Sequence, residues 1–243
     1  MKRLIGLVSI FLPWSLKRQV LVRVFGFQID RTATIGLSWV TPEKSLVMGP
    51  RARIGHLNVI KSVDEVRMDE GSLIGTLNWI TANLAGFSEP ELDERIKNRR
   101  SGLHLGRFSS VSTRHYFDCS DLIEIGDFSD VAGLRSVLLT HHMNIQSGQQ
   151  YCLPINIGSH CFLSTNAVIL GGATLPHHSI LAAGAVLVDV QAESYSLYAG
   201  CPARRKKEYD HDIGWFRRSS ESIIESRLRW SLKPGFRSPR RDL

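Results

Sequence analysis

The chain has 243 residues, a net charge of +7 and 43% apolar residues, so it can bury a sizeable core and is not disordered throughout. Its four cysteines form no CxxC pair and no cluster with histidine, which predicts reduced cytoplasmic thiols and excludes an obvious zinc site. Clustered positive charge suits nucleic acid, anionic lipid or a phosphorylated ligand. No nucleic-acid-binding module accompanies it, so nucleic acid is not an expected partner.

Residues 1–29 predict a helical segment that is both apolar and basic, because no acidic residue precedes Asp30. The apolar run from Leu4 to Trp14 contains Pro13 and is shorter than the ~20 residues of a membrane-spanning helix. No small-residue cleavage site follows, which argues against a signal peptide. Two interpretations stay open: a helix packed on the main domain, or one lying on an anionic membrane surface at the cytoplasmic face.

Residues 30–205 carry an internal repeat with a period of six. Aliphatic residues recur at this interval and each is followed four positions later by a small residue, five times in succession. The aliphatic positions are Ile157, Leu163, Ile169, Leu175, Leu181 and Leu187; the small ones are Cys161, Ala167, Ala173, Ser179 and Ala185.

Two further registers precede this run: Ile125, Val131 and Val137, and before them Leu105, Val111 and Phe117. A period of six fits no α-helix, but it is even and therefore keeps one face of a strand inward. An aliphatic residue at only every sixth position favours very short strands separated by corners. Coils of this kind bury a continuous aliphatic ladder only when they stack.

Two segments leave the repeat, at residues 82–102 and 142–154, and they predict loops extruded from the coil. Loops on a rigid scaffold are common places for functional residues. Residues 206–243 predict a C-terminal helix, with Ile223, Ile224 and Leu228 on one side, followed by a basic tail.

This repeat resembles that of the hexapeptide-repeat acyltransferases. Within that family, the sequence looks most similar to the O-acetyltransferases of bacterial surface polysaccharides. The resemblance implies an all-β fold, a left-handed parallel β-helix. It also implies acetyl-CoA as the acyl donor, no metal, a sugar or glycan acceptor, and a homotrimer that binds CoA between neighbouring subunits.

His141 is the candidate catalytic residue, in the segment Leu138–His142 at the edge of the second extruded loop. We expect it where the repeat would place a small inward residue, which marks a point where the coil opens. In the family a histidine at such an edge is the general base. Imidazole, with an unperturbed pKa of ~6.5, suits proton transfer from a sugar hydroxyl near neutral pH. The alternative is a hydrogen-bonded structural histidine.

The segment 112–118 is the candidate acceptor site. It looks like the Arg-His-Tyr-x-Asp segment of the surface-polysaccharide acetyltransferases, which assigns sugar binding to Arg114, His115, Tyr116 and Asp118. Asp118 is also a candidate to orient a histidine. Other branches of the family place an asparagine in this region to hold the acceptor, and this segment has none. A polar coil corner remains the alternative.

The candidate cofactor site combines small residues with a basic run near the end of the repeat. Small residues allow a ligand to approach the backbone, and arginine forks suit phosphate. The segment 198–204 resembles the family's closing motif, with Cys201 in place of asparagine. By that resemblance CoA would contact Ala183, Gly184, Ala185, Gly200, Pro202, Arg204 and Arg205. A solvated basic run is the alternative.

Three other functions fit the fold less well. A carbonic anhydrase needs three converging histidines, and the adjacent pairs at 141–142 and 177–178 do not supply the spacing. A non-catalytic scaffold or binding protein would not need His141 or the closing motif. An N-acyltransferase acting on an amino sugar stays open, since the same base serves both reactions.

Overall fold

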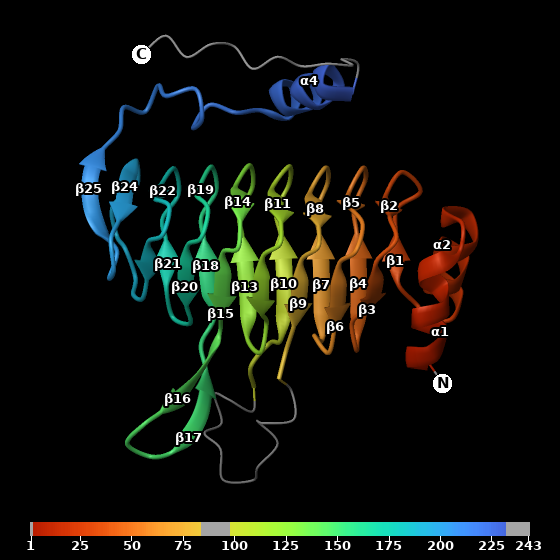
Figure 1. The fold of residues 1–243 in the computed structure, drawn as a ribbon. Coiled ribbons are helices and arrows are strands. Elements are labelled where there is room, and N and C mark those ends of the chain that lie inside the picture. Colours follow the sequence, from red (N-terminus) through yellow and green to blue (C-terminus); the bar gives the residue numbers. More distant parts are fainter. Residues whose placement is uncertain (1, 84–97, 232–243) are drawn as a thin grey trace.

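The computed structural model describes residues 2–83 and 98–231. Each successive short strand in the body of the chain moves to the next of three parallel sheets, so the backbone winds as a three-sided coil (Figure 1). Many strands consist of only two residues, because a strand on one side of the coil needs only one side chain that points into the core. The coil begins at Gln28 and its last strand ends at Glu208, close to the predicted limits of 30 and 205.

The strands of each sheet follow one another along the coil axis. Sheet A contains β1 (Gln28–Ile29), β4 (Ser45–Met48), β7 (Glu65–Met68), β10 (Gly102–Leu105), β13 (Leu122–Ile125), β18 (Ile155–Ile157) and β21 (Thr174–Leu175). Sheet B contains β2 (Thr34–Ile35), β5 (Arg53–Ile54), β8 (Leu73–Thr76), β11 (Ser110–Thr113), β14 (Asp130–Leu134), β19 (Phe162–Leu163), β22 (Ile180–Leu181), β24 (Ser196–Ala199) and β25 (Arg204–Glu208). Sheet C contains β3 (Trp39–Thr41), β6 (Val59–Lys61), β9 (Trp79–Thr81), β12 (Tyr116–Asp118), β15 (Val137–Leu139), β20 (Val168–Leu170) and β23 (Val186–Leu187). The strands β24 and β25 pair antiparallel and close sheet B.

The predicted aliphatic ladder forms the core. All six residues from Ile157 to Leu187 are buried, and so are the five small residues at the fixed offset, from Cys161 to Ala185. The earlier register of Leu105, Val111 and Phe117 is buried as well. Strands this short gain most of their stability from stacking, because each coil covers the apolar side chains of the next.

The predicted register of Ile125, Val131 and Val137 was wrong at its last position. Ile125 and Val131 are buried as expected, but Leu138 rather than Val137 points into the core. The cause is an extra residue in β14: Val111 pairs with Val131, whereas Thr113 pairs with Leu134. This bulge moves the inward position of the next strand, β15, by one residue.

In the first coils an isoleucine is followed by glycine at residues 35–36, 54–55 and 74–75, and the glycines have a steric cause. A Cβ on Gly55 or Gly75 would run into the carbonyl group of the coil above, at Gly75 and Ser112 respectively. Glycine therefore allows neighbouring coils to approach at this corner of the prism.

The N-terminal segment is a helical cap on the first coil. It consists of α1 (Lys2–Val8), η1 (Ser9–Phe11) and α2 (Trp14–Arg23), with the break at Pro13. Lys17 is buried and donates to the carbonyl oxygens of Gly36 and Ser38, at 2.7 and 2.9 Å. Burial lowers the pKa of Lys17 to about 8. The lysine thus satisfies backbone acceptors at the open end of the β-helix.

Two insertions leave the coil at the corner between sheets C and A. The predicted loop 142–154 is an antiparallel hairpin of β16 (His141–Asn144) and β17 (Gln149–Cys152), which projects from the prism (Figure 1). The other predicted loop, 82–102, lies mostly outside the described residues.

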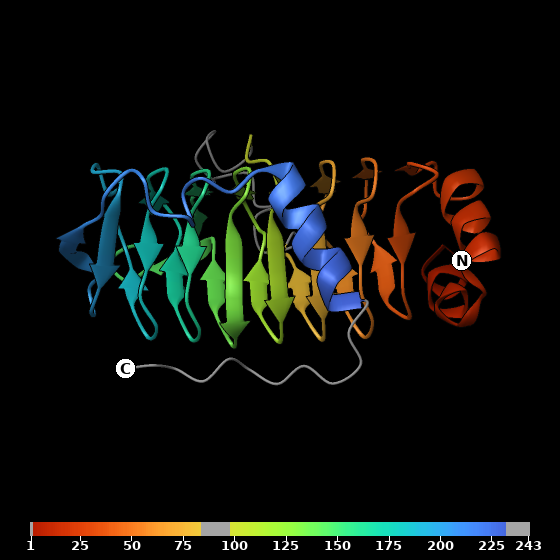
Figure 2. The ribbon, with the colours of Figure 1, turned by 90° about the horizontal axis from the view of Figure 1, so that it is seen from above.

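The predicted C-terminal helix is α4 (Ser220–Ser231), and it lies across the outer face of sheet B (Figure 2). Arg218, just before it, forms an ion pair with Asp130 of β14 at 2.9 Å and stacks over the ring of Trp215. The tail beyond residue 231 lies outside the described residues. Within the part of the chain that the structure describes, no helix is long and apolar enough to cross a bilayer.

Candidate active site

His141 and Asp118 form a hydrogen-bonded pair at the base of the hairpin. Nδ1 of His141 lies 2.6 Å from Oδ2 of Asp118. The carboxylate accepts only, so it fixes the proton of the neutral ring on Nδ1 and leaves Nε2 as the proton acceptor. The carboxylate side chain is 5% exposed, whereas the imidazole is 36% exposed. The arrangement is a buried orienting acid behind an accessible base.

Asp118 is itself held in place by its surroundings. Its Oδ1 accepts a hydrogen bond from the backbone N–H of Ser120 at 3.0 Å and a longer one from the hydroxyl of Thr140 at 3.2 Å. Thr140 also donates to the main-chain oxygen of Asp118 at 2.8 Å and accepts from the N–H of Asp121 at 2.9 Å. These bonds tie the coil of β12 to the coil that leads into the hairpin, so the pair is rigid before any ligand binds.

The expectation that His141 occupies a small inward position was wrong. Thr140 takes the buried position next to the core, and His141 points outward. The bulge in β14 is again the reason, because the six-residue count was extended across it. Because the imidazole of His141 points outward, it is accommodated without a packing cost in the core.

His142 differs from His141 in its surroundings. Its ring stacks on Tyr151 at 5.2 Å, and its Nε2 is buried without a hydrogen-bond partner among the described residues. Burial, with His141 beside it, lowers the pKa of His142. Gly171 lies against the hairpin base, where a Cβ would meet His142 and the carbonyl oxygens of Thr140 and Leu153. His142 therefore packs the hairpin onto the coil.

The four residues predicted to bind the acceptor separate into two groups. Tyr116 and Asp118 lie on the outer face of β12, on either side of the inward Phe117, and Tyr116 is exposed. Arg114 is exposed at the corner before β12. His115 is instead fully buried, and its two ring nitrogens bond to the hydroxyl of Ser112 and the N–H of Ser136.

His115 belongs to a ladder of polar side chains that joins successive coils at one corner. Asn58 accepts from the N–H of Asn78 at 2.9 Å, and Asn78 accepts from the N–H of His115 at 2.9 Å. Burial lowers the pKa of His115 to about 4, so the ring is neutral at physiological pH. This residue fits the polar-corner alternative and offers no free nitrogen to a sugar.

Two of the buried cysteines, Cys119 and Cys161, do not offer a nucleophile. Cys119 follows Asp118 but is fully buried, and burial together with Asp118 raises the pKa of its thiol well above the usual value. Cys161 is also buried, and burial raises its pKa to about 12. Neither thiol forms a thiolate near neutral pH.

The residues predicted for the cofactor lie together at the far corner of the C-terminal coils. The loop around Gly184 stacks on the closing loop, since Val186 donates to Gly200 at 2.9 Å and Ala203 donates to Val186 at 2.7 Å. Ala183, Gly184, Gly200 and Pro202 are exposed there. Ala185 is buried as one of the small core residues, so its side chain does not reach a ligand.

The predicted phosphate clamp is already paired with acids. Arg204 lies 3.3 Å from Asp189, and Arg205 lies 2.9 Å from Glu208 and 3.6 Å from Glu193. These pairs are exposed and therefore weak, so phosphate can compete for both arginines. Lys206 and Lys207 continue the basic run along β25.

Within one chain, the base lies at the edge of sheet C where its strands end, whereas the Gly184 loop lies at the edge where they begin. His141 follows β15, whereas Gly184 precedes β23, and the two strands are parallel members of the sheet with β20 between them. The structure does not bring these two predicted sites together in one chain.

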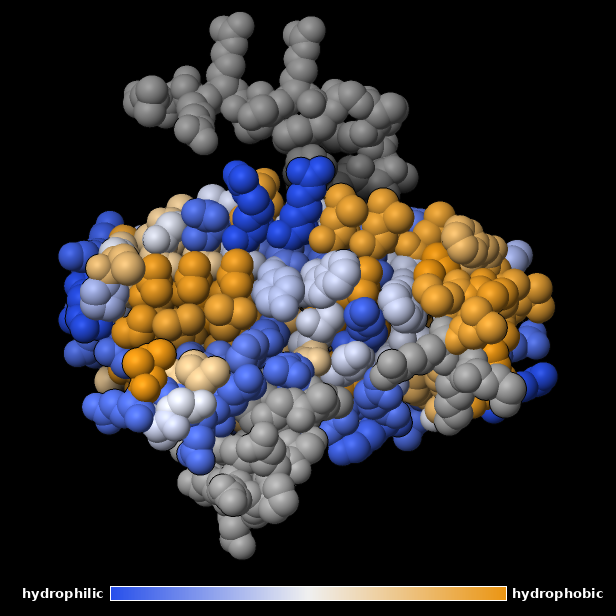
Figure 3. All heavy atoms as spheres, turned by 60° about the horizontal axis from the view of Figure 1, so that its bottom comes forward, coloured by the Kyte–Doolittle hydropathy of each residue, from blue (hydrophilic) through white to orange (hydrophobic). Residues whose placement is uncertain are grey.

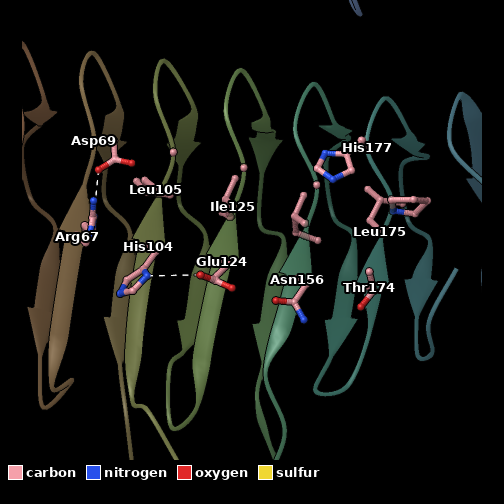
Figure 4. Close-up of a pocket in the computed structure, with 15 residues that line it drawn as sticks. Arg67, Asp69, His104, Leu105, Glu124, Ile125, Asn156, Thr174, Leu175 and His177 are labelled. Carbon is pink, nitrogen blue, oxygen red and sulfur yellow. Dashed lines mark hydrogen bonds and ion pairs between the residues drawn. The ribbon is translucent and has the colours of Figure 1, made fainter. Parts of the chain in front are cut away.

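A separate groove runs over the outer face of sheet A (Figure 4). Its charged groups are largely paired: Arg67 with Asp69 at 3.1 Å, and His104 with Glu124 at 3.6 Å. His104 also lies 2.8 Å from Glu65, which does not line the groove. Arg67 is its only arginine or lysine among the described residues, so the groove does not suit the phosphates of CoA. Among those residues no group of three or more histidine, cysteine or acidic side chains could hold a metal ion.

The comparisons with known proteins concern the fold. No family model and no curated protein sequence matches the chain. Among solved structures, it is similar to the polysialic acid O-acetyltransferase OatWY, with 16% identity over 75% of this chain and 84% of that one and a TM-score of 0.55. It is also similar to a hexapeptide-repeat acetyltransferase of Vibrio cholerae complexed with acetyl-CoA, with 24% identity over 44% of this chain and a TM-score of 0.42.

A maltose O-acetyltransferase of Clostridium difficile also has 24% identity over 44% of the chain, and a TM-score of 0.42. The matched regions span about three fifths of these last two proteins, at 61% and 59% of their lengths. Of these three matches, the one with OatWY extends over most of both chains. The chain therefore has the parallel β-helix fold of the polysialic acid O-acetyltransferase OatWY.

Proposed function

We propose that this protein is an acetyl-CoA-dependent O-acetyltransferase that modifies a hydroxyl of a sugar or glycan, built on a β-helix of left-handed sense. The observation that carries the proposal is the pair of His141 and Asp118. An accessible imidazole, oriented by a buried carboxylate at a corner where the coil opens, is what general-base catalysis requires. The fold is that of an enzyme whose name specifies acetyl transfer to a glycan.

The chemistry assigned to the chain is one direct transfer. Acetyl-CoA supplies a thioester carbonyl. His141 accepts the hydroxyl proton at Nε2 as the sugar oxygen attacks that carbonyl, and Asp118 stabilises the imidazolium that forms. The C–S bond breaks and the proton returns to the departing sulfur, giving the ester and free CoA. The buried, protonated thiols are consistent with a route that has no acyl-enzyme.

A homotrimer is part of the proposal, with CoA between neighbouring subunits. The separation of His141 from Gly184 and the basic run supports it, because His141 follows the last residue of β15 whereas Gly184 precedes the first residue of β23. In this arrangement the base of one subunit faces the Gly184 corner of the next. Arg204, Arg205 and Lys206 then meet the phosphates after exchanging their acidic partners.

Contact with the inner face of an anionic membrane is the remaining part. The structure changes the basis for it, since Lys17 is buried in the cap and Arg18 donates to the carbonyl oxygen of Ile29 at 2.7 Å. Five apolar side chains of the cap are exposed and offer another basis: Leu4, Leu7, Val8, Phe11 and Leu16. Figure 3 shows apolar side chains gathered over this end of the molecule.

The proposal is tested by release of free thiol from acetyl-CoA in the presence of nucleotide sugars, lipid-linked glycans, oligosaccharides and amino sugars. We expect hydroxyl acceptors to release thiol, and His141→Ala to abolish the release. Activity with amino sugars alone would favour an N-acyltransferase. No release with any acceptor, although acetyl-CoA binds, would favour a binding protein.

A further inference from the structure

The outer face of sheet C carries a row of exposed aromatic rings that begins next to the catalytic pair. Tyr116 and Asp118 project from the same face of β12, because the buried Phe117 lies between them. Trp79 pairs directly with Tyr116 in the neighbouring strand, and Thr81 pairs with Asp118. Trp79 is 46% exposed and Tyr116 is 39% exposed, although both are large side chains on regular strands.

The row continues away from the pair toward the N-terminal end of the coil. Trp39 is aligned with Trp79 through Val59, which pairs with both. The four strands β12, β9, β6 and β3 span about 14 Å at the usual strand spacing of ~4.8 Å. This length accommodates more than one sugar ring.

Three cations flank the same rings. The ammonium group of Lys61 lies 5.0 Å from the ring of Trp39 and 5.8 Å from that of Trp79. Arg114 and Arg135 are exposed on successive coils at the other edge of the sheet, where the N–H of Arg135 donates to the carbonyl oxygen of Arg114 at 3.0 Å. None of the three forms an ion pair with a described residue, in contrast to Arg204 and Arg205.

Carboxylates are scarce on this face. Among the described strand residues that point outward from sheet C, Asp118 is the one acid, and its charge is directed at His141. The field over the aromatic row is therefore positive. The groove on sheet A is the opposite case, since its lining carries Asp69 and Glu124 against Arg67.

We propose that this face is the acceptor subsite, and that the acceptor is a chain of acidic, carboxylate-bearing sugars. The inference rests on the proposed function and names its substrate class. The apolar faces of the sugar rings pack on Tyr116 and Trp79. These side chains lie one and two strands away from β15, the strand that leads into His141. Lys61, Arg114 and Arg135 pair with the carboxylates, and a hydroxyl of the ring beside Tyr116 then faces Nε2 of His141.

The test is binding of oligosaccharides to the full-length protein without acetyl-CoA, measured by isothermal titration calorimetry. The probes are oligosialic acid and oligogalacturonate hexamers, with maltohexaose as the neutral chain of equal length. We expect the acidic chains to bind more tightly than maltohexaose and to lose affinity as salt rises. Lys61→Met and Arg135→Met should each weaken binding of the acidic chains up to about five-fold. Trp79→Ala should weaken it about ten-fold.

Arg53→Met is the matched control, since Arg53 is an exposed arginine on the outer face of sheet B. It should leave binding unchanged. Equal affinity for maltohexaose and the acidic chains, or loss of binding in Glu124→Gln but not in Lys61→Met, would overturn the inference. Thiol release from acetyl-CoA separates the two proposals. Turnover with neutral acceptors only would support the proposed acetyltransferase activity and rule out acidic sugars as its substrate class. Tight binding of acidic chains without turnover would support the acidic-sugar subsite and rule out the acetyltransferase activity.

Discussion

The imidazole of His141 and the carboxylate of Asp118 are joined at 2.6 Å although they belong to adjacent coils and lie 23 residues apart. The acid is almost completely buried, and the bonds from Ser120 and Thr140 fix it independently of the histidine. The pair thus separates two tasks: the coil of β12 holds the orienting charge, and the base of the hairpin presents the proton acceptor.

Replacing the base should remove most of the turnover and little of the binding. His141→Ala is expected to lower kcat by ~10²–10⁴-fold, the range for loss of general-base assistance. KM for acetyl-CoA should change little, because the Gly184 corner and the basic run are untouched. Steady-state thiol release measures both.

His142→Ala is the internal control for that experiment. The ring packs on Tyr151 and its Nε2 faces the protein interior, so the change should cost far less in kcat. If His142→Ala abolished turnover while His141→Ala retained it, the assignment of the base would be wrong.

Asp118→Asn should preserve the shape of the site and lose its orienting charge. An amide can donate to Nδ1, which places the ring proton on Nε2 and removes the acceptor. We expect kcat to fall by about 10²-fold or more, with KM nearly unchanged. Asp121→Asn, a change in a neighbouring buried carboxylate that bonds to the N–H of Leu122, should leave kcat near that of the wild type. Equal losses in the two variants would point to a general disturbance of the corner.

The aliphatic ladder should tolerate no charge. Leu175→Asp places a carboxylate in the fully buried core and should lower the free energy of unfolding by several kcal/mol. Val190→Asp, at a position that is 67% exposed, should change it by ~0.5 kcal/mol or less. Thermal unfolding followed by circular dichroism compares the two, and similar melting temperatures would contradict the ladder.

The buried His115 should make the fold sensitive to acid. Its pKa is about 4 in the folded protein, below the ~6.5 of an exposed histidine, so the unfolded chain binds the proton more readily. Stability from this residue is complete above pH 6.5 and is lost as pH falls toward 4, by at most about 3 kcal/mol. His115→Asn continues the ladder of Asn58 and Asn78 without a titrating group. In urea unfolding, the free energy of unfolding should fall less between pH 7 and 4.5 for this variant than for the wild type. The same dependence on pH in both proteins would refute the role of His115 in acid sensitivity.

The cap should bind lipid through its apolar side chains. Phe11 is 83% exposed and Leu4 is 66% exposed, so their joint replacement by serine should weaken binding to anionic vesicles by about ten-fold or more. Val190→Ser, on the opposite end of the coil, is the control. Vesicle co-sedimentation at low salt is the measurement, and absence of wild-type binding would remove the membrane from the proposal.

The sequence by itself determined the coil. A period of six with a small residue at a fixed offset constrains both the short strands and the side chains that stack inside them, and the buried ladder from Ile157 to Leu187 confirms it. The position of His141 at an extruded segment was also visible, because the hairpin interrupts that period. These features are local or strictly repetitive, so they can be counted along the chain.

Only the tertiary structure decided what faces what. The bulge in β14 inverts the assignments of Val137 and Leu138 and turns His141 outward, and nothing in the spacing announces an extra residue inside a strand. The pairing of Asp118 with His141, the burial of His115 and the alignment of Trp79 with Tyr116 all arise between coils. Residues in adjacent coils are about twenty or more positions apart, and their contact depends on the length of every corner between them.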